Sequence, residues 1–371
     1  ELTLAFQGVM KADKDNIIQA IDDFDRHASK ASTKLRELNN VLEKVDPSVL
    51  PSEYREKFQE LSTKTQDLNG IIKKVNGVTE ELKIFLGAEK DRRYLLVFQN
   101  NNELRATGGF IGSYALVEFS EGKIEEVRVP EGGSYDVRAG MTEFYEAPEP
   151  LHLASPLWHF WDGNWWPDWP TSAQNLMRFY SDSGGPTVDG VISFTPTVLE
   201  RVLEVTGPID MEEEYGVTFT PENCEESLRN IIEKEAGHVD TDNTKEEDRD
   251  ITDPKQIIGD LMDKVVEKTT EELDRQQLAE LIKISSNSLR EKQILFYFEN
   301  KELQEEIEKR GWSGEMEKTK RDYLSVINSN IAGKKSDKMI EQEIEHKAVI
   351  KQGGKIVDQV TITRTHTGDE D

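Results

Sequence analysis

A regular spacing of apolar residues dominates the first 86 positions of this 371-residue chain and limits what they can fold into. Apolar or small side chains recur at alternating steps of four and three residues in two runs, which are separated by Pro47 and Pro51. This spacing forms the seam of a coiled coil, and proline ends a helix. The first run is Ile17, Ile21, Phe24, Ala28, Ala31, Leu35, Leu38, Leu42 and Val45, and the second is Tyr54, Phe58, Leu61, Thr65, Leu68, Ile72, Val75, Thr79 and Leu82.

The two runs predict an antiparallel hairpin of two helices over residues 1–86, roughly 50 Å long at 1.5 Å per residue. Two interpretations of this hairpin stay open. The simpler one is a coiled-coil-like stalk or spacer, which needs no partner. The other is a surface that binds a specific partner protein.

A different pattern begins near residue 87. The run "YLLVF" is continuously apolar, which is typical of a strand buried on both faces. Other strand-like runs, among them "FIGSYALVEF" and "VDGVISF", alternate with capped amphipathic segments such as "TPTVLERVLEVTG". Alternating strands and helices predict an α/β domain over residues 87–335, with a central mixed sheet and helices on both of its faces.

The spacing of apolar residues changes once more in residues 336–371. Apolar side chains occupy every second position on both sides of a "QGGK" turn, which predicts a β-hairpin. The same pattern would also open a longer β-rich domain. The chain starts without a methionine and ends at "RTHTGDED", directly after a strand-like pattern, so we expect it to be part of a longer protein. No apolar run reaches the ~18 residues of a membrane span, so we expect any membrane anchor to lie outside this sequence.

The charge balance narrows the classes of partner. The chain has 73 Asp and Glu against 46 Lys and Arg, a net charge of −27. Binding to nucleic acid depends on basic side chains that neutralise phosphates, so this balance argues against a nucleic-acid partner. The single cysteine, Cys224, allows neither a disulfide within the chain nor a cysteine metal cluster.

Polar side chains crowd the segment that directly follows the first buried strand. In α/β sheets, ligands bind outside the carboxyl ends of the strands. An arginine there can grip an anion bidentately, and a glycine pair lets backbone N–H groups come close to it. The alternative is that the amides satisfy a buried turn. The candidate residues are Gln99, Asn100, Asn102, Arg105, Gly108 and Gly109.

Five of the six tryptophans fall within "WHFWDGNWWPDWP", interleaved with Asp162, Asn164 and Asp168. Indole rings stabilise cores when buried, and their faces also stack on sugars and cover lipid chains. Two interpretations therefore stay open: core or loop anchors, or a cleft lined by indoles such as Trp165, with carboxylates at its mouth. The polar residues within the run favour the cleft.

One short segment, "SDSGGP" at 181–186, is similar to the nucleophile segment of trypsin-like serine proteases. That chemistry requires a histidine base and an oriented carboxylate. None of the six histidines has the matching sequence context, and the chain is rich in helices. We interpret the segment as a glycine-rich turn between a helix and a strand.

Several blocks resemble a bacterial cell-envelope family known only as a domain of unknown function (number four-zero-one-two). They are "RRYLLVFQNNNELRATGGFIGSYALV", "DGNWWPDWPTSA", "VDGVISFTPTVLERVLEVTGPI" and "SVINSNIAGKKSD", and the resemblance covers roughly residues 86–368. It implies an N-terminal membrane helix outside this sequence and a protein at the extracellular face of the membrane or in the cell wall. The helical hairpin would then be a spacer close to the membrane.

The order of the blocks is also similar, more distantly, to the LytR-CpsA-Psr family. That resemblance implies transfer of a glycopolymer from a polyprenyl-pyrophosphate carrier, with arginines and aspartates that hold the pyrophosphate and a magnesium ion. Arg105 fits the arginine of the first block, but Thr107 and Gly108 stand near the expected aspartate. In the later arginine-rich stretch only Arg249 is present, and Asp136 is the residue that could replace the lost carboxylate.

Two functions are consistent with these patterns. In the first, the α/β domain binds or transfers a lipid-linked glycan as a metal-assisted phosphotransferase. Its predicted catalytic residues are Arg105, Asp162 and Asp168, its predicted magnesium ligands are Asp162 and Asp168, and its predicted ligand-binding residues are Gln99, Asn100, Asn102, Gly108, Gly109, Asn164, Trp165 and Arg249. In the second, the protein is a non-catalytic envelope scaffold or binding module, in which the helical hairpin contacts the partner.

Overall fold

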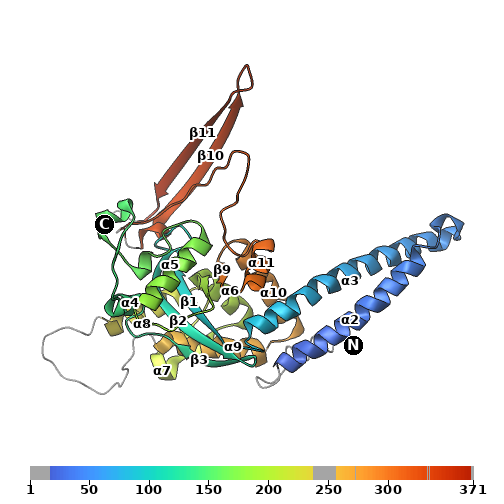
Figure 1. The fold of residues 1–371 in the computed structure, drawn as a ribbon, viewed down its shortest axis with the longest axis horizontal. Helices are drawn as coiled ribbons and strands as arrows, with labels where there is room; N and C mark the ends of the chain where they lie inside the picture. The colour runs from blue at the N-terminus through green and yellow to red at the C-terminus, as the bar shows by residue number, and fades with distance from the viewer. Residues whose placement is uncertain (1–16, 237–255, 272, 332, 334, 369–371) are drawn as a thin grey trace.

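The computed structural model describes residues 17–236, 256–271, 273–331, 333 and 335–368. It has the predicted class: an N-terminal helical hairpin, a mixed α/β body and a C-terminal β-hairpin (Figure 1). The division into domains at residues 86 and 335 stays a prediction. None of the described helices is both long enough and apolar enough to span a membrane.

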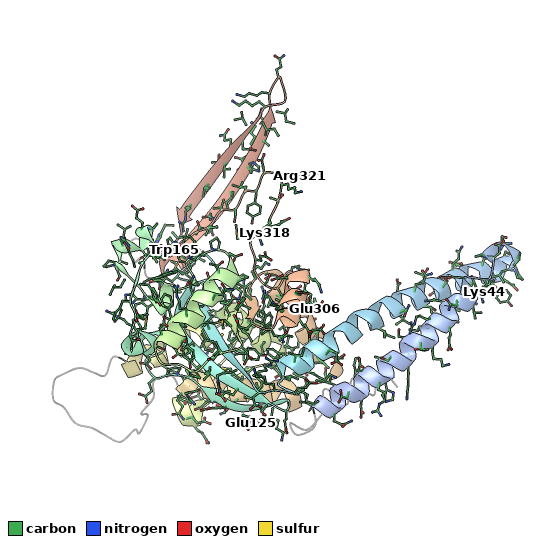
Figure 2. The ribbon with its side chains drawn as sticks, in the orientation of Figure 1. Lys44, Glu125, Trp165, Glu306, Lys318 and Arg321 are labelled. Atoms are coloured by element: carbon green, nitrogen blue, oxygen red, sulfur yellow. The ribbon has the colours of Figure 1, made fainter. Side chains whose placement is uncertain are left out.

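The helical hairpin projects from the body as a long arm (Figure 1). Helix α2 (Ile17–Leu42) leads through the short 3-10 helix η1 (Pro47–Val49) into α3 (Ser52–Phe85). Asp46 caps η1, since its side chain accepts a hydrogen bond from the backbone N–H of Ser48 at 2.8 Å. Figure 2 shows Lys44 at the far end of the arm, where the chain reverses.

The seam between the two helices differs from the predicted one. Thr65, Ile72 and Thr79 of α3 are buried against α2, as the heptad spacing predicts. Ile21, Ala28 and Leu42 of α2 are buried as predicted. The seam also has a polar part, because Ser32 of α2 is buried and its hydroxyl lies 3.3 Å from the side-chain oxygen of Asn69. The leucines predicted to share the seam are exposed instead. They are Leu38, Leu61, Leu68 and Leu82.

A five-stranded mixed sheet forms the centre of the body, with strand order β3-β2-β1-β6-β9. Its central strand β1 pairs in parallel with β6 and antiparallel with β2, and the other neighbours are antiparallel. The continuous apolar run of β1 explains its central position, because a central strand is covered on both faces. The strands are β1 (Arg92–Asn100), β2 (Phe110–Ser120), β3 (Lys123–Arg128), β6 (Gly190–Phe194) and β9 (Ile294–Phe298).

Each face of the sheet has its own apolar core. On one face, Leu95 and Val97 of β1 pack with Trp169 and Phe179 of helix α5 (Trp169–Asp182). On the other face, Tyr94 packs against the end of the helical arm. Its ring stacks on Phe85 of α3 with 4.8 Å between centroids, and its hydroxyl donates to the Phe85 carbonyl.

Shorter elements complete the body. A third apolar cluster joins α6, β7, β8, α8 and α9 beside the sheet. The remaining elements are α4 (Ser134–Gly140), β4 (Tyr145–Glu146), η2 (Glu149–Leu153), β5 (Leu157–Trp158), η3 (Phe160–Asp162), α6 (Pro196–Thr206), β7 (Ile209–Met211), α7 (Glu212–Tyr215), β8 (Val217–Phe219), α8 (Cys224–Ala236), α9 (Gln256–Glu271), α10 (Arg275–Arg290), α11 (Lys301–Lys309) and η4 (Ser336–Met339).

The C-terminal hairpin is the second projecting element (Figure 1). Strands β10 (Ile340–Ile350) and β11 (Ile356–His366) pair antiparallel, with Ile344 opposite Ile362. Successive side chains of a strand point to opposite faces, so the isoleucines of the two strands share one face. That face is exposed in the described structure.

Gly190 shows how tightly β6 is enclosed by its neighbours. A Cβ at this position would lie 2.3 Å from the carbonyl oxygen of Tyr297 in β9. We expect Gly190→Ala to lower the free energy of unfolding by about 1–3 kcal/mol, because the backbone of β9 must shift. Gly259→Ala in α9 is the matched control, since its Cβ meets no atom within 4 Å. It should stabilise by about 0.5–1 kcal/mol. Urea unfolding measures both, and equal effects would contradict this packing.

Candidate functional site

The polar segment predicted as an anion site lies in the loop between β1 and β2. This loop follows the carboxyl end of β1, next to the carboxyl end of its parallel neighbour β6. The position is the one at which α/β sheets bind ligands. The register of β1 against β2 shifts between Phe98 and Gln99, so a β-bulge turns the Gln99 side chain toward the loop.

The first half of the site is a buried amide cluster. The Gln99 carbonyl oxygen accepts three hydrogen bonds, from Thr107 Oγ1 at 2.9 Å, Gly109 N at 3.1 Å and Asn164 Nδ2 at 2.8 Å. Asn164 is fully enclosed, and its Nδ2 also donates to Thr107 Oγ1 and to the Gly109 carbonyl. The cluster therefore fastens the loop to the tryptophan-rich segment. These amides satisfy a buried turn, which was the alternative interpretation of the sequence.

The glycine pair also serves the loop itself. Gly108 has φ +147°, and a Cβ there would lie 3.2 Å from the Gln99 side-chain oxygen. A Cβ on Gly109 would lie 2.0 Å from the Asn100 carbonyl oxygen. Both glycines are required because the chain passes close to its own preceding strand. The Gly109 N–H, which could have met an anion, is bonded to Gln99.

Arg105 forms the second half of the site and is almost fully buried. Its Nε donates to Asp162 Oδ1 at 3.1 Å, and Nη2 lies 3.1 Å from the same oxygen and 3.3 Å from Glu103 Oε1. Its Nη1 donates to the carbonyl oxygens of Leu104 and Asn330. Every nitrogen of the guanidinium thus has an acceptor within the protein, and the Cζ atom lies 5.2 Å from the centroid of the Phe110 ring.

The asparagines of the loop make contacts within the fold as well. Asn100 Oδ1 accepts a hydrogen bond from the Asn102 N–H at 2.9 Å, which forms a local turn. Asn102 Nδ2 donates to Glu225 of α8. Asn101 Nδ2 donates to Thr197 Oγ1 in the first turn of α6, at 3.0 Å. The loop is therefore bonded to two helices outside the sheet.

The two carboxylates predicted to bind magnesium have separate roles in the structure. Asp162 pairs with Arg105. Asp168 caps helix α5: its Oδ2 accepts from Thr171 N and Oγ1, and its Oδ1 accepts from Met316 N at 2.9 Å. Among the described residues, no group of three or more His, Cys, Asp or Glu side chains could hold a metal ion. These donors do not by themselves compose a magnesium site, and magnesium stays a prediction.

The tryptophans of this segment are divided between the core and the surface, where Trp166 is 42% exposed. Trp169 is fully buried in the core, and Trp158 packs edge-on against Phe179 while its Nε1 donates to the Asp162 carbonyl at 2.8 Å. Trp161 stacks on His159 with 4.2 Å between ring centroids. Trp165 is half-buried and lies toward the end of the body from which the β-hairpin projects (Figure 2). Arg249 lies outside the described residues.

Two residues that join the site were not predicted, namely Asn330 and Asp337. Asn330 N donates to the Leu104 carbonyl at 2.8 Å, and the Leu104 N–H donates to Asp337 Oδ2 at 3.0 Å. Asn330 Nδ2 donates to the same Asp337 oxygen at 2.7 Å. Both belong to the block "SVINSNIAGKKSD", and that block was the available signal. The segment before β10 is therefore fastened to the loop after β1.

Comparison with known proteins finds a family model that matches the middle of the chain. Residues 89–232 match the family model described as "Protein of unknown function (DUF4012)". The resemblance read from the sequence blocks is thereby confirmed for this part of the chain. No curated protein and no solved structure matches. The likeness to the LytR-CpsA-Psr family stays a resemblance of block order.

The ion pair of Arg105 generates a first prediction for this site. Arg105→Ala would leave the carboxylates of Asp162 and Glu103 without their buried counter-charge. We expect the free energy of unfolding to fall by about 3–5 kcal/mol. Arg36→Ala, at an exposed position of α2, is the control and should change it by less than ~0.5 kcal/mol. Equal urea midpoints for both variants would contradict the role given to Arg105.

Burial of Asp162 also makes the stability of the protein depend on pH. It raises the pKa of the Asp162 carboxyl above the ordinary 3.8, although Arg105 opposes this. A raised pKa means that the folded chain still holds a proton that the unfolded chain has released. Stability therefore falls as pH rises from the ordinary pKa through the raised one. We expect Asp162→Asn to flatten this fall, whatever its effect on overall stability. Urea unfolding across this pH range tests it, and an unchanged slope would contradict it.

Proposed function

We propose that this chain is a non-catalytic binding module of the cell envelope, whose helical arm docks an amphipathic helix of a partner protein. The observation that carries the proposal is an exposed heptad stripe on α3. Its residues are Tyr54, Leu61, Leu68 and Leu82, with exposed fractions of 54%, 47%, 49% and 36%. We call these four residues the α3 stripe. Apolar side chains at seven-residue spacing are the pattern by which one helix packs on another.

The state of the loop after β1 favours this function over phosphotransfer. A pyrophosphate group needs free N–H donors, and arginine supplies them best as a bidentate fork. Each nitrogen of Arg105 is already bonded to the protein, and so is the N–H of Gly109. Binding an anion there would require breaking a buried ion pair with Asp162, which is costly.

Because the two helices run antiparallel, further apolar residues of α2 lie beside the α3 stripe. Positions three residues along a helix from the seam lie about 60° to one side of it, because each residue turns about 100°. In an antiparallel pair, reversal of direction places this flank of both helices on the same side. Leu38 and Val41 of α2 are therefore on the side of the α3 stripe, and both are exposed. The result is one apolar face along the arm.

Charges along this face indicate the chemistry of the partner. Lys57 and Lys64 each follow a stripe residue by three positions, and Lys34 has the matching position on α2. Lys34 and Lys64 form ion pairs only with exposed glutamates of their own helices, and such pairs contribute little. Lys34, Lys57 and Lys64 therefore place basic side chains directly beside the apolar face, in a chain of net charge −27.

A partner helix whose apolar stripe is flanked by Asp and Glu would complement this face. A second copy of the chain, packed face to face, would bring lysines against lysines. Since α3 has 34 residues, it offers about 50 Å of length, which suits several heptads of a partner.

Designed peptides test this face directly. One peptide carries leucine heptads flanked by glutamate, and the other carries the same heptads flanked by lysine. We expect only the glutamate-flanked peptide to bind, with an affinity that falls as salt rises. Leu61→Glu together with Leu68→Glu should abolish binding, and Lys57→Glu with Lys64→Glu should switch the preference to the lysine-flanked peptide. Fluorescence anisotropy measures each affinity.

The matched control is Gln59→Glu with Gln66→Glu, which places the same charges on α3 at exposed positions away from the stripe. It should leave binding of the glutamate-flanked peptide within about twofold of the wild type. Binding that survives in the leucine variant would contradict the proposal. So would saturable binding of a polyprenyl pyrophosphate that is lost in Arg105→Ala while the fold is retained.

A further inference from the structure

A cavity of about 270 Å³ lies beside the turn that follows α5, apart from the loop after β1. None of the residues that line it belongs to the network of Gln99 and Arg105. It opens between the edge of the sheet formed by β2 and β3, the start of α4 and the "SDSGGP" turn. Its lining includes Tyr114, Arg128, Asp136, Tyr180, Gly184 and Gly185.

The "SDSGGP" segment builds one wall of this cavity. Helix α5 ends at Asp182, and the chain turns through Ser183 and Gly184, as the sequence predicts for a glycine-rich turn. Gly184 has φ +86°, and a Cβ there would meet no atom within 4 Å. A Cβ on Gly185 would lie 2.7 Å from the Tyr180 ring. The turn therefore rests on that ring and leaves open space at Gly184.

Two tyrosine hydroxyls at this cavity have no hydrogen-bond partner among the described residues. Tyr114 and Tyr180 are 5% and 6% exposed, and their rings meet edge to face at 5.6 Å. Neither hydroxyl is among the fully enclosed atoms that lack a partner, so each can still be reached from outside. Burial raises the pKa of both phenols, which keeps them neutral and able to donate and accept.

The charged groups at the mouth largely cancel. The Arg128 guanidinium bonds to the Glu126 carboxylate through Nε and Nη2, at 2.8–3.1 Å. Asp136 keeps a carboxylate at the cavity, with one oxygen accepting the Gly132 N–H at 2.8 Å. An anion in the cavity would meet the Asp136 carboxylate and an arginine that is already paired with Glu126. The mouth therefore disfavours anions and offers acceptors to hydroxyl groups.

We propose that this cavity binds one ring of a neutral polyhydroxylated ligand, a sugar unit. Small-molecule sites are mostly apolar with a few placed polar groups, and they usually measure 300–1,000 Å³. A volume of about 270 Å³ is slightly below that range and suits a single ring. The hydroxyl ends of Tyr114 and Tyr180 reach the cavity, where the two phenols can donate and accept, and Asp136 can accept from the hydroxyls of the ligand. This site is separate from the helical arm, so it stands or falls independently of the proposed function.

The test uses the whole chain with its tyrosine rings labelled with carbon-13. Glucose, galactose, mannose and N-acetylglucosamine are titrated separately and followed by NMR. We expect at least one of them to shift the Tyr114 and Tyr180 ring signals in a saturable way. The affinities of the wild type and of the double variant Tyr114→Phe, Tyr180→Phe are compared by isothermal titration calorimetry, and the double variant should bind that sugar at least tenfold more weakly, because two hydrogen bonds are lost.

A stability measurement separates a ligand role from a structural one. The double variant should keep or raise the melting temperature, since neither hydroxyl bonds to the protein. Tyr94→Phe is the matched control and should lower it, because the Tyr94 hydroxyl donates to the Phe85 carbonyl at 3.0 Å.

Three results would overturn the proposal. One is that no sugar shifts either ring up to its solubility limit. Another is that the double variant binds as well as the wild type. The third is that inorganic phosphate shifts the same rings and displaces the sugar, which would identify an anion site.

Discussion

The buried ion pair between Arg105 and Asp162 is the interaction on which the arrangement of the body depends. Through it, the loop after β1 is joined to the tryptophan-rich segment, and through the Asn330 carbonyl the same guanidinium reaches the chain before β10. These three segments are far apart in the sequence and share no strand of the central sheet. A buried charge has to be paired where it lies, so the pair fixes their relative positions.

The same pairing decides what this edge of the sheet can do. Polar residues at the end of a parallel strand can bond either to a ligand or to other groups of the protein. A donor that is already bonded within the protein is not available to a ligand. Here the donors of Arg105, Asn164 and Gly109 are matched by carboxylate, amide and carbonyl oxygens of the protein. The loop keeps the position of an α/β ligand site, but most of the hydrogen-bonding groups there are bonded within the protein, and the buried Asn164 Oδ1 is an exception.

Local patterns in the sequence predicted the elements well, and the choice of neighbours less well. The run "YLLVF" indicated a strand covered on both faces, and Leu95 and Tyr94 do point into opposite cores. The amide cluster was anticipated only as an alternative, because a sequence shows that Gln99 and Asn164 are polar without showing that they meet. Asn330 and Asp337 were missed for the same reason, since more than 200 positions separate each from Leu104.

The heptads show this limit most clearly. The spacing of Leu61 and Leu68 predicted two helices, but it could not tell which flank each helix would turn toward the other. The hairpin buries Ile72, Thr65 and Ser32 among others, and leaves Leu38, Leu61, Leu68 and Leu82 exposed. Leaving leucine in water forgoes burial worth about 1.5–3 kcal/mol per side chain, so an arm used only as a spacer would gain stability from the opposite choice. Because Phe85 packs on Tyr94, the sheet already holds the base of α3. The two helices are held together by this base and by the buried residues between them, and Leu38, Leu61, Leu68 and Leu82 contribute little to that contact because they stay largely exposed.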